Sequence, residues 1–196
     1  MQEDEIFALF DRFRYITPQG SPLSAIGNNW QVQSLSNCYV IPKVIDSYCG
    51  ILYSDQQLVQ IMKRRGGGGV CIDNLRPKGL VTRNAAKTTG GIAVFMKRFS
   101  NSCREVAQGG RRGALMICLS AHHPEIETFI KIKQDKTSVT GANLSVKFSD
   151  EFMEAVLKDK EYETRWPVNA EKPVVSKMIP ARKVWEMFIE ASWGFG

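Results

Sequence analysis

The sequence predicts an α/β fold built on parallel strands. Short apolar runs typical of strands alternate with longer segments of helical period, in the order strand, helix, loop, helix, strand, helix, strand, helix. The chain has 196 residues, 43% hydrophobic and 23% charged, which is the composition of a globular protein with a sizeable core. No repeat or linker divides it, so we expect residues 1–196 to form a single unit.

The N-terminal segment predicts one helix and one strand. Residues 4–14 carry apolar side chains at helical spacing, whereas residues 15–29 contain prolines and glycines that favour a loop. Residues 35–41 form a short, partly β-branched run that Pro42 ends, and we interpret this run as a buried strand.

Two helices are predicted in the middle of the chain. Residues 54–57 match a capping box, and the helix expected there ends at the glycine run of residues 66–69. A second helix is predicted over residues 91–107, because the apolar side chains keep to one face. Residues 70–89, between the two helices, show no regular pattern.

The C-terminal half continues the alternation. It predicts a buried strand over 114–119, a helix that opens at Pro124, a half-buried strand over 143–148, a helix capped by Ser149 and a last helix that opens at Pro180. Residues 161–177 are polar and contain two prolines, so we assign them no element.

Composition and charge exclude several classes of protein. No apolar run reaches the ~18 residues of a membrane span, and the acidic residues 1–5 are unlike a signal or transit peptide. Five scattered cysteines without a CxxC pair argue against a disulfide framework or structural zinc site and favour a reducing cytoplasm. The net charge of +6 favours an anionic partner: a nucleotide, a nucleic acid or an anionic membrane.

Two glycine-rich segments each allow two interpretations. Residues 66–69 follow a predicted helix and lack the lysine of a P-loop, so they are either a flexible helix stop or a place where backbone approaches a ligand. Residues 108–113, Gln-Gly-Gly-Arg-Arg-Gly, join a helix to a strand. They are either a solvated turn or a ligand loop in which Gln108 contacts a base and arginine contacts phosphate.

Histidine and cysteine residues carry weaker signals. The adjacent His122 and His123 do not face the same way, so we expect them to form hydrogen bonds or caps rather than bind a metal. Cys103 and Cys118 fall at apolar positions and are expected in the core, which is also the usual place for a lone cysteine such as Cys38. Basic residues are spread over loops without interleaved aromatics, which fits a small nucleotide at least as well as a nucleic acid.

Eight segments spread over nearly the whole chain form an ordered set: QSLSNCYVIP (33–42), MKRRGGGGV (62–70), LRPKG (75–79), FM (95–96), VAQGGRRGALM (106–116), HPEI (123–126), GANLSV (141–146) and DEFMEAV (150–156). In this order and at this spacing they resemble the catalytic large subunit of ribonucleotide reductase. Their wording is most similar to that of the adenosylcobalamin-dependent class.

The resemblance implies the first half of a ten-stranded α/β barrel, with the second half absent from this chain. It also implies radical reduction of ribonucleotides (di- or triphosphates) to 2′-deoxyribonucleotides, in which one cysteine becomes a thiyl radical and two others end as a disulfide. The implied ligands and partners of the complete enzyme are adenosylcobalamin, the ribonucleotide substrate, a deoxynucleoside triphosphate or ATP effector, and a thioredoxin-type reductant.

The resemblance assigns roles to individual residues. Cys38 matches a catalytic, reducing cysteine. The residues that match substrate contacts are Ser36, Asn37, Gly67, Gln108 and Arg112. Those that match the effector site are Asp46, Ser47, Arg76, Arg83, Gln108, Gly109, Gly110 and Arg111, with Asp46 at the effector's 3′-hydroxyl and Arg76 and Arg83 at its phosphates. The loop of residues 108–114 would couple effector identity to substrate choice, and no metal site is implied.

One motif of the family is absent from its expected place. The family's radical cysteine lies in an Asn-x-Cys-x-Glu motif, and residues 101–105 have this spacing but fall within the helix predicted over 91–107. The second reducing cysteine and the C-terminal thiol tail have no match, and Cys71 stands near a position where asparagine is common. We therefore expect the chain to be inactive alone, to need the C-terminal part in trans, and to form a homodimer through the helices at 54–65 and 91–107.

Two alternatives remain open on sequence alone. One is a non-catalytic nucleotide-binding or regulatory module that keeps the effector site without the chemistry. The other is a basic RNA-binding protein, which predicts strongly salt-dependent binding. The reductase interpretation instead predicts neither a nucleic-acid nor a membrane partner, and a cytoplasmic location in a bacterium or a phage-infected cell for a split-gene product or a truncated piece.

Overall fold

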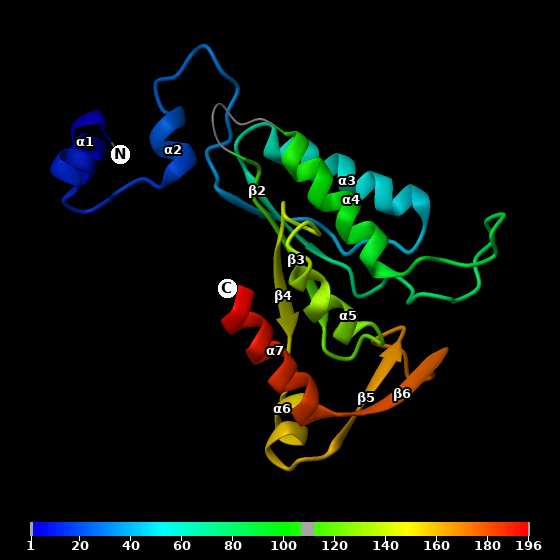
Figure 1. The fold of residues 1–196 in the computed structure, drawn as a ribbon. Coiled ribbons are helices and arrows are strands. Elements are labelled where there is room, and N and C mark those ends of the chain that lie inside the picture. Colours follow the sequence, from blue (N-terminus) through cyan, green and yellow to red (C-terminus); the bar gives the residue numbers. More distant parts are fainter. Residues whose placement is uncertain (1, 107–111, 196) are drawn as a thin grey trace.

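The computed structural model describes residues 2–106 and 112–195, and its centre is a four-stranded parallel sheet (Figure 1). The strands are β1 (Cys38–Val40), β2 (Gly67–Cys71), β3 (Leu115–Ser120) and β4 (Asn143–Lys147), and they lie side by side in chain order. Each neighbouring pair is parallel. The predicted α/β class is therefore confirmed.

Helices connect the parallel strands, as parallel pairing requires. Between successive strands run α3 (Tyr48–Met62), α4 (Ile92–Glu105), and α5 (Ile126–Lys131) with the short turn η2 (Ile132–Gln134). The helices α3 and α4 lie next to each other in Figure 1, and Arg98 Nε of α4 donates to Asp55 Oδ2 of α3 at 3.0 Å. No helix of the described residues is long and apolar enough to cross a membrane.

The remaining elements flank this sheet. On the C-terminal side follow α6 (Asp150–Leu157), the antiparallel hairpin of β5 (Glu161–Trp166) and β6 (Val175–Pro180), and α7 (Ala181–Phe195). On the N-terminal side are α1 (Glu3–Phe10), η1 (Asp11–Phe13) and α2 (Gly20–Ala25). The α1 segment projects away from the sheet in Figure 1 and buries none of its residues.

The two faces of the sheet differ in burial. Alternate residues such as Val70, Ile117 and Leu119 are at most 1% exposed and join one hydrophobic cluster with helix residues such as Leu58 and Phe99. The register places a different set on the opposite face: Cys38, Gly67, Gly69, Cys71, Met116, Cys118, Ser120, Asn143, Ser145 and Lys147. Met116 on this open face is 41% exposed, so the core lies between the sheet and its helices.

The helix predicted to open at Ser54 begins earlier. The side chain of Ser47 caps α3, because its Oγ accepts a hydrogen bond from the Gly50 backbone N–H at 3.0 Å. Ser54 lies inside that helix and is 4% exposed. The capping-box prediction was wrong here because Ser47 is followed at the third helical position by Gly50, which gives no box pattern.

The glycine run forms a strand rather than a flexible stop. Residues Gly67 to Gly69 belong to β2 and pair with β1 and β3 on its two sides. A Cβ on Gly68 would come within 2.5 Å of Leu58 Cδ2, so the absence of a side chain lets α3 pack directly onto this strand. The predicted end of the preceding helix is confirmed, since α3 ends at Met62.

Three further predictions need correction. The segment at 161–177, assigned no element, contains β5 and the start of β6, and its buried Tyr162 and Thr164 show the strand alternation. The strand predicted to be buried over 35–41 is shorter and exposed, because β1 is the edge of the sheet. A short helix, α2, also lies in the segment predicted to be a loop.

Candidate functional site

A cavity of about 710 Å³ opens beside the carboxyl ends of β1 and β2. It is lined by Asp46, Ser47, Tyr48, Ile51, Arg76, Val81, Thr82, Arg83, Asn84, Thr89 and Phe95. Four of these residues, Asp46, Ser47, Arg76 and Arg83, were assigned to an effector site by resemblance, and the fold brings all four to one cavity. The carboxyl edge of a parallel sheet is the usual position of ligand sites in α/β proteins.

The cavity is organised by an ion pair between Asp46 and Arg76. Arg76 Nε donates to Asp46 Oδ2 at 2.6 Å, and the Arg76 backbone N–H donates to Asp46 Oδ1 at 3.2 Å. The Arg76 and Asp46 side chains are 29% and 22% exposed, so each keeps an accessible surface. A carboxylate has about four acceptor positions, so Asp46 can still accept a hydrogen bond from a ligand hydroxyl.

The Arg76 guanidinium is held from two further sides. Its Nη1 donates to the Val81 carbonyl at 2.5 Å, and its Cζ lies 5.7 Å from the centre of the Trp166 ring. Trp166 Nε1 in turn donates to the Asn74 carbonyl at 3.1 Å. The hairpin of β5 and β6 therefore helps to position the Arg76 guanidinium. The sequence had indicated only the loop that carries Arg76.

His123 contacts the loop that carries Arg76 through its neighbour Leu75. Its Nε2 lies 2.8 Å from the Leu75 carbonyl, and its Nδ1 accepts from the Glu125 backbone N–H at 3.1 Å. A carbonyl only accepts and an N–H only donates, so the ring is neutral with its proton on Nε2. Burial lowers the pKa of His123, which keeps it in this form. The predicted hydrogen-bonding role of the histidines is confirmed, and His122 also pairs its Nδ1 with the Glu163 carbonyl at 3.0 Å.

Arg83 is carried by a tight turn on the outer wall of the cavity. Thr82 Oγ1 donates to Asn84 Oδ1 at 2.6 Å, and Asn84 Nδ2 donates to the Thr88 carbonyl at 3.2 Å. An isolated bridge between Val81 and Thr88 closes the turn. Within the described ranges, Arg83 forms no ion pair, so its charge is available to an anionic ligand.

A second group of assigned residues gathers at the amino ends of the strands. Cys38 lies opposite Gly67 in the β1–β2 pair, and the Gly67 N–H donates to the Asn37 carbonyl at 2.6 Å. Asn37 Oδ1 accepts from the Ser21 N–H at 2.7 Å, and Ser36 Oγ donates to the Cys38 carbonyl at 3.4 Å. Cys38, Ser36, Asn37 and Gly67 are thus neighbours at this edge of the sheet.

The thiol of Cys38 is exposed, and the expectation that it is buried was wrong. The physical cause is its place on an edge strand and on the open face of the sheet. Cys103 is buried as expected, at 1% exposed, whereas Cys118 is only partly buried. Arg112 is exposed just before β3. The assigned residues Gln108, Gly109, Gly110 and Arg111 lie outside the described residues.

The Asn-x-Cys-x-Glu spacing at 101–105 belongs to a structural helix. All five residues lie in α4, and the carbonyl and sulfur of Cys103 pack where a Cβ on Gly113 would fall, at 2.7 and 2.9 Å. Burial raises the pKa of the Cys103 thiol. Cys103 is therefore a packing residue and not an exposed radical cysteine.

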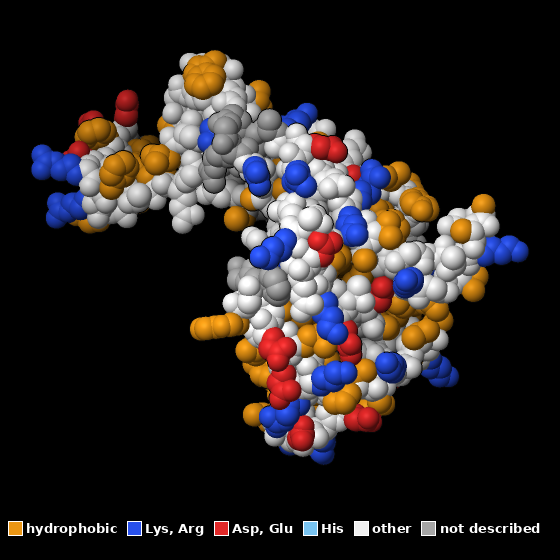
Figure 2. Space-filling view, in the orientation of Figure 1, with side chains coloured by type: hydrophobic (Ala, Val, Ile, Leu, Met, Phe, Trp, Pro, Cys, Tyr) orange, Lys and Arg blue, Asp and Glu red, His pale blue; other side chains and the backbone are white. Residues whose placement is uncertain are grey.

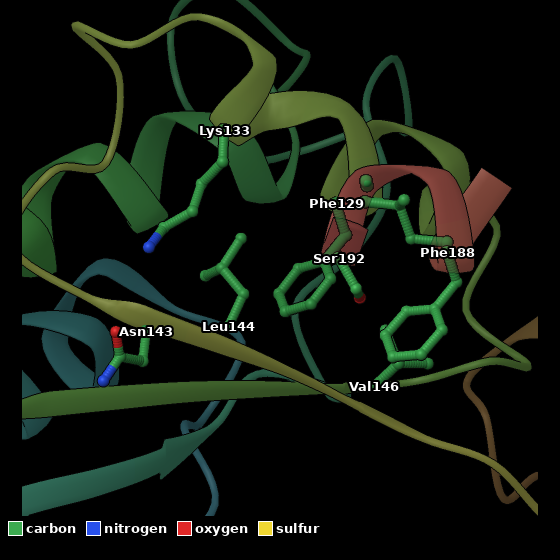
Figure 3. Close-up of a pocket in the computed structure, with 9 residues that line it drawn as sticks. Phe129, Lys133, Asn143, Leu144, Val146, Phe188 and Ser192 are labelled. Atoms are coloured by element: carbon green, nitrogen blue, oxygen red, sulfur yellow. The ribbon is translucent and has the colours of Figure 1, made fainter. Parts of the chain in front are cut away.

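A further cavity of about 390 Å³ lies between β4, α5 and α7. Figure 3 shows Leu144 and Val146 of β4 facing Phe129 of α5 and Phe188 of α7, with Lys133 and Asn143 toward one side. Its lining mixes apolar side chains with Lys133, Asn143 and Ser192 and includes none of the assigned site residues. The part of the chain that the structure describes also contains no group of three or more His, Cys, Asp or Glu residues suited to a metal ion.

Charge on the surface is dispersed. On the face drawn in Figure 2, lysine and arginine side chains are spread over the molecule and interleaved with acidic ones. A polyanion site needs clustered positive charge, so this face does not favour the RNA-binding alternative.

Comparison with known proteins identifies the family of the chain. The family model described as "Ribonucleotide reductase, barrel domain" matches residues 36–196, which is most of the chain. The α/β sheet and the matched sequence define the class: the chain belongs to the family of ribonucleotide reductase barrel domains.

The similarity extends to individual reductases. The chain is 34% identical over 161 residues to a vitamin B12-dependent ribonucleoside-diphosphate reductase of Thermoplasma acidophilum, covering 81% of this chain and 20% of that protein. It is 29% identical over 164 residues to the enzyme of the same name from Mycobacterium tuberculosis, covering 83% and 23%. A ribonucleoside-diphosphate reductase large subunit of Caenorhabditis elegans is 26% identical over 180 residues, covering 79% and 23%. The chain thus spans about a fifth of the length of these relatives.

Sequence reasoning missed several residues around the cavity. Tyr48 and Phe95 line it as an edge-to-face pair with ring centres 6.1 Å apart, and the Trp166 ring lies next to the Arg76 guanidinium. Phe95 was recognised as part of a helical apolar face and, with Met96, as a segment that matches the family, but neither observation placed it at a cavity. Tyr48 follows a capping serine that carried no recognised pattern, and Trp166 lies in a strand that was not predicted.

Proposed function

We propose that the cavity at Asp46 and Arg76 binds a deoxynucleoside triphosphate, or ATP, as an allosteric effector. The Asp46–Arg76 pair on the wall of a nucleotide-sized cavity is the observation that carries this proposal. Asp46 accepts a hydrogen bond from the 3′-hydroxyl of the sugar, and Arg76 and Arg83 bind the phosphates. The rings of Tyr48 and Phe95 contact the base. Ser47, beside Asp46, borders the same sugar.

The amino edge of the sheet is the proposed substrate side. There Cys38 supplies reducing equivalents to a ribonucleotide, with a second cysteine that this chain does not provide. The two thiols become a disulfide, while the 2′-hydroxyl leaves as water and hydrogen takes its place. Ser36, Asn37 and Gly67 contact the substrate, and Gln108 and Arg112 approach its base from the loop that also contacts the effector through Gly109, Gly110 and Arg111.

The complete enzyme needs components beyond this chain. Adenosylcobalamin is the proposed radical source, in line with the vitamin B12-dependent relatives. The charged cavity described above suits hydroxyl and phosphate groups, not a corrin, so we assign the cofactor to the remainder of the enzyme. The proposed partners are that remainder in trans, a second copy of this chain and a thioredoxin-type reductant.

Reconstitution tests this function. The chain is mixed with a polypeptide carrying the rest of the barrel, adenosylcobalamin, a dithiol reductant, and ribonucleoside di- or triphosphates, and deoxynucleotide is measured by chromatography. We expect product with the wild-type chain, none with Cys38→Ser, and product again with the matched Cys49→Ser variant. If no product forms although the two polypeptides are folded and bound to each other, the proposal that this chain is part of an active reductase is wrong.

A non-catalytic regulatory module is the second candidate. It is favoured by one observation: Asp46, Ser47, Arg76 and Arg83 line one cavity, whereas the Asn-x-Cys-x-Glu spacing lies in α4 with its cysteine, Cys103, buried. This candidate predicts effector binding that is weakened by Arg76→Ala, together with no activity in any reconstituted mixture.

A further inference from the structure

Two cysteines outside the proposed sites are direct neighbours across the sheet. Cys71 of β2 and Cys118 of β3 are partners in the parallel register. Adjacent strands lie about 4.8 Å apart, which falls within the ~4.4–6.8 Å that separates the Cα atoms of a disulfide. Residues in register point to the same face, and a hydrogen bond joins the two thiols, so the sulfurs are in direct contact.

This thiol pair is separate from Cys38. In the register, Cys38 lies opposite Gly67, four residues before Cys71 on the same strand. At about 3.3 Å per residue, that places the pair roughly 13 Å from Cys38 along the sheet. Both thiols are only partly buried and carry no disulfide, so a small oxidant can reach them.

Charged groups surround Cys71 more than Cys118. Lys147 Nζ of β4 donates a hydrogen bond to Cys71 Sγ at 3.2 Å and a second to the carboxylate of Asp73. Asp73 Oδ1 also accepts from the Ser120 N–H at 2.7 Å, which fixes that carboxylate at the ends of β2 and β3. Lys147 is thus held where its charge stabilises a thiolate on Cys71.

The same contacts shift the pKa values of the two thiols in opposite directions. A hydrogen bond from the Cys118 thiol, with help from the Asp73 backbone N–H and Lys147, lowers the pKa of Cys71 to about 6, against burial and the Asp73 carboxylate. The pKa of Cys118 is raised, chiefly because its proton is shared with Cys71 and because it is buried. At neutral pH one sulfur is a thiolate and its neighbour a thiol, the combination that a nucleophile and a resolving cysteine need.

We propose that Cys71 and Cys118 form a redox pair that a peroxide oxidises to a reversible disulfide. The Cys71 thiolate attacks a peroxide oxygen of hydrogen peroxide, the O–O bond breaks, and the product is a Cys71 sulfenic acid plus hydroxide, which takes a proton to become water. The Cys118 sulfur then displaces the sulfenic hydroxyl, and its proton leaves with that oxygen as a second water. The two sulfurs lose two electrons, and the peroxide gains them; a dithiol reductant reverses the bond.

Peptide mapping tests the pair directly. The 196-residue chain is treated with hydrogen peroxide, blocked with an alkylating agent and digested with trypsin without reduction. Cys71 and Cys118 fall in separate tryptic peptides, residues 66–78 and 113–131, each with a single cysteine. We expect these peptides to be linked, the intact chain to lose the mass of two hydrogens, and the five free thiols to fall by two until a dithiol is added.

Variants give the controls. Cys71→Ser and Cys118→Ser should each abolish the linked peptide, and Cys49→Ser, on the exposed side of α3, should leave it unchanged. Lys147→Met should slow its formation several-fold at pH 7, because Cys71 loses thiolate character. The proposal is overturned if the wild-type chain retains all five thiols under peroxide, or if the linked peptides join any other cysteines. Because that mapping uses the wild-type chain, it stands even if a variant fails to fold.

Discussion

Arg76 and Asp46 lie thirty residues apart in the sequence, yet two hydrogen bonds join them. Asp46 follows β1 and Arg76 follows β2, so parallel pairing of these strands brings the two loops to one edge of the sheet. The ion pair is therefore a product of the fold and not of local sequence. A substitution that shifts β1 relative to β2 should therefore lengthen or break the hydrogen bonds between Asp46 and Arg76.

The role of Asp46 can be tested with the ligand as well as the protein. The wild-type chain should bind dTTP more tightly than 2′,3′-dideoxy-TTP, because only dTTP donates a 3′-hydroxyl to the carboxylate. A hydrogen bond to a charged group contributes about 1.5–3 kcal/mol, which corresponds to roughly tenfold or more in affinity. In Asp46→Asn this preference should shrink, as measured by calorimetric titration. An undiminished preference in the variant would place the hydroxyl elsewhere.

A glycine at the start of α3 should matter for the same site. A Cβ on Gly50 would fall 2.5 Å from Ile45 Cβ and 2.7 Å from the Ile45 carbonyl oxygen. Gly50→Ala should push the segment that carries Asp46, cost about 1–3 kcal/mol in the free energy of unfolding and weaken dTTP binding. Gly194→Ala in α7 is the matched control, since its Cβ would meet nothing within 4 Å. Denaturant titration and calorimetry distinguish the two; equal stability of both variants would refute the packing argument.

The outer face of α3 should form a homodimer contact. Leu52 and Tyr53 are 45% and 58% exposed there, and Val94 of the adjacent α4 is 54% exposed. Leu52→Asp should shift the chain toward monomer in sedimentation experiments, because it places a charge in an apolar interface. Ile189→Asp in α7, where the native side chain is 47% exposed, is the matched control and should leave the distribution unchanged. An equal effect of both substitutions would argue against α3 as the interface.

The thiolate of Cys71 predicts an unusual pH dependence of alkylation. Iodoacetamide reacts with thiolates, so labelling of the peptide at 66–78 should rise with a midpoint near pH 6, the pKa expected for Cys71. The groups facing this sulfur are Cys118, Asp73 and Lys147. Lys147→Met removes a stabilising charge and should move the midpoint upward. A midpoint near 9, the ordinary value, in the wild-type chain would contradict the arrangement.

The lowered pKa of Cys71 also makes the stability of the fold depend on pH. The folded-state pKa of Cys71 lies below its ordinary value of 9.0, so the folded chain binds fewer protons than the unfolded chain between about pH 6 and 9. Its contribution to stability is present above that window and is lost as the pH falls through the folded-state pKa. Cys118, whose pKa is raised, acts in the opposite direction at higher pH.

Elements with clear side-chain patterns could be predicted from the sequence. The apolar run that forms β3, the alternation in β4 and the cap at Ser149, whose Oγ accepts from the Phe152 N–H at 3.2 Å, all appear where expected. The strand β2 could not, because glycines have no side chains to show a period, and its pairing is set by neighbours distant in the chain. The exposure of β1 likewise depends on sheet order, which no local pattern encodes.

The candidate site was less accessible to sequence reasoning. Composition and periodicity could not connect Asp46 with Arg83, and only the resemblance to a known family grouped them. The structure adds physical content that the resemblance lacked: the neutral His123 beneath Leu75, and the Trp166 ring beside the Arg76 guanidinium. Both depend on long-range packing, and Trp166 lies in a hairpin whose alternation was hidden among polar residues.

Calorimetric titration of the chain with dTTP measures whether the Asp46–Arg76 cavity binds a deoxynucleoside triphosphate. We expect saturable binding that Arg76→Ala weakens by about tenfold or more, since a charge-assisted contact to phosphate is lost. Arg64→Ala, which removes an arginine paired with Gln60 after α3, should bind as the wild type does. Absence of binding to the folded wild-type chain, or equal affinity in Arg76→Ala, would contradict an effector site at this cavity.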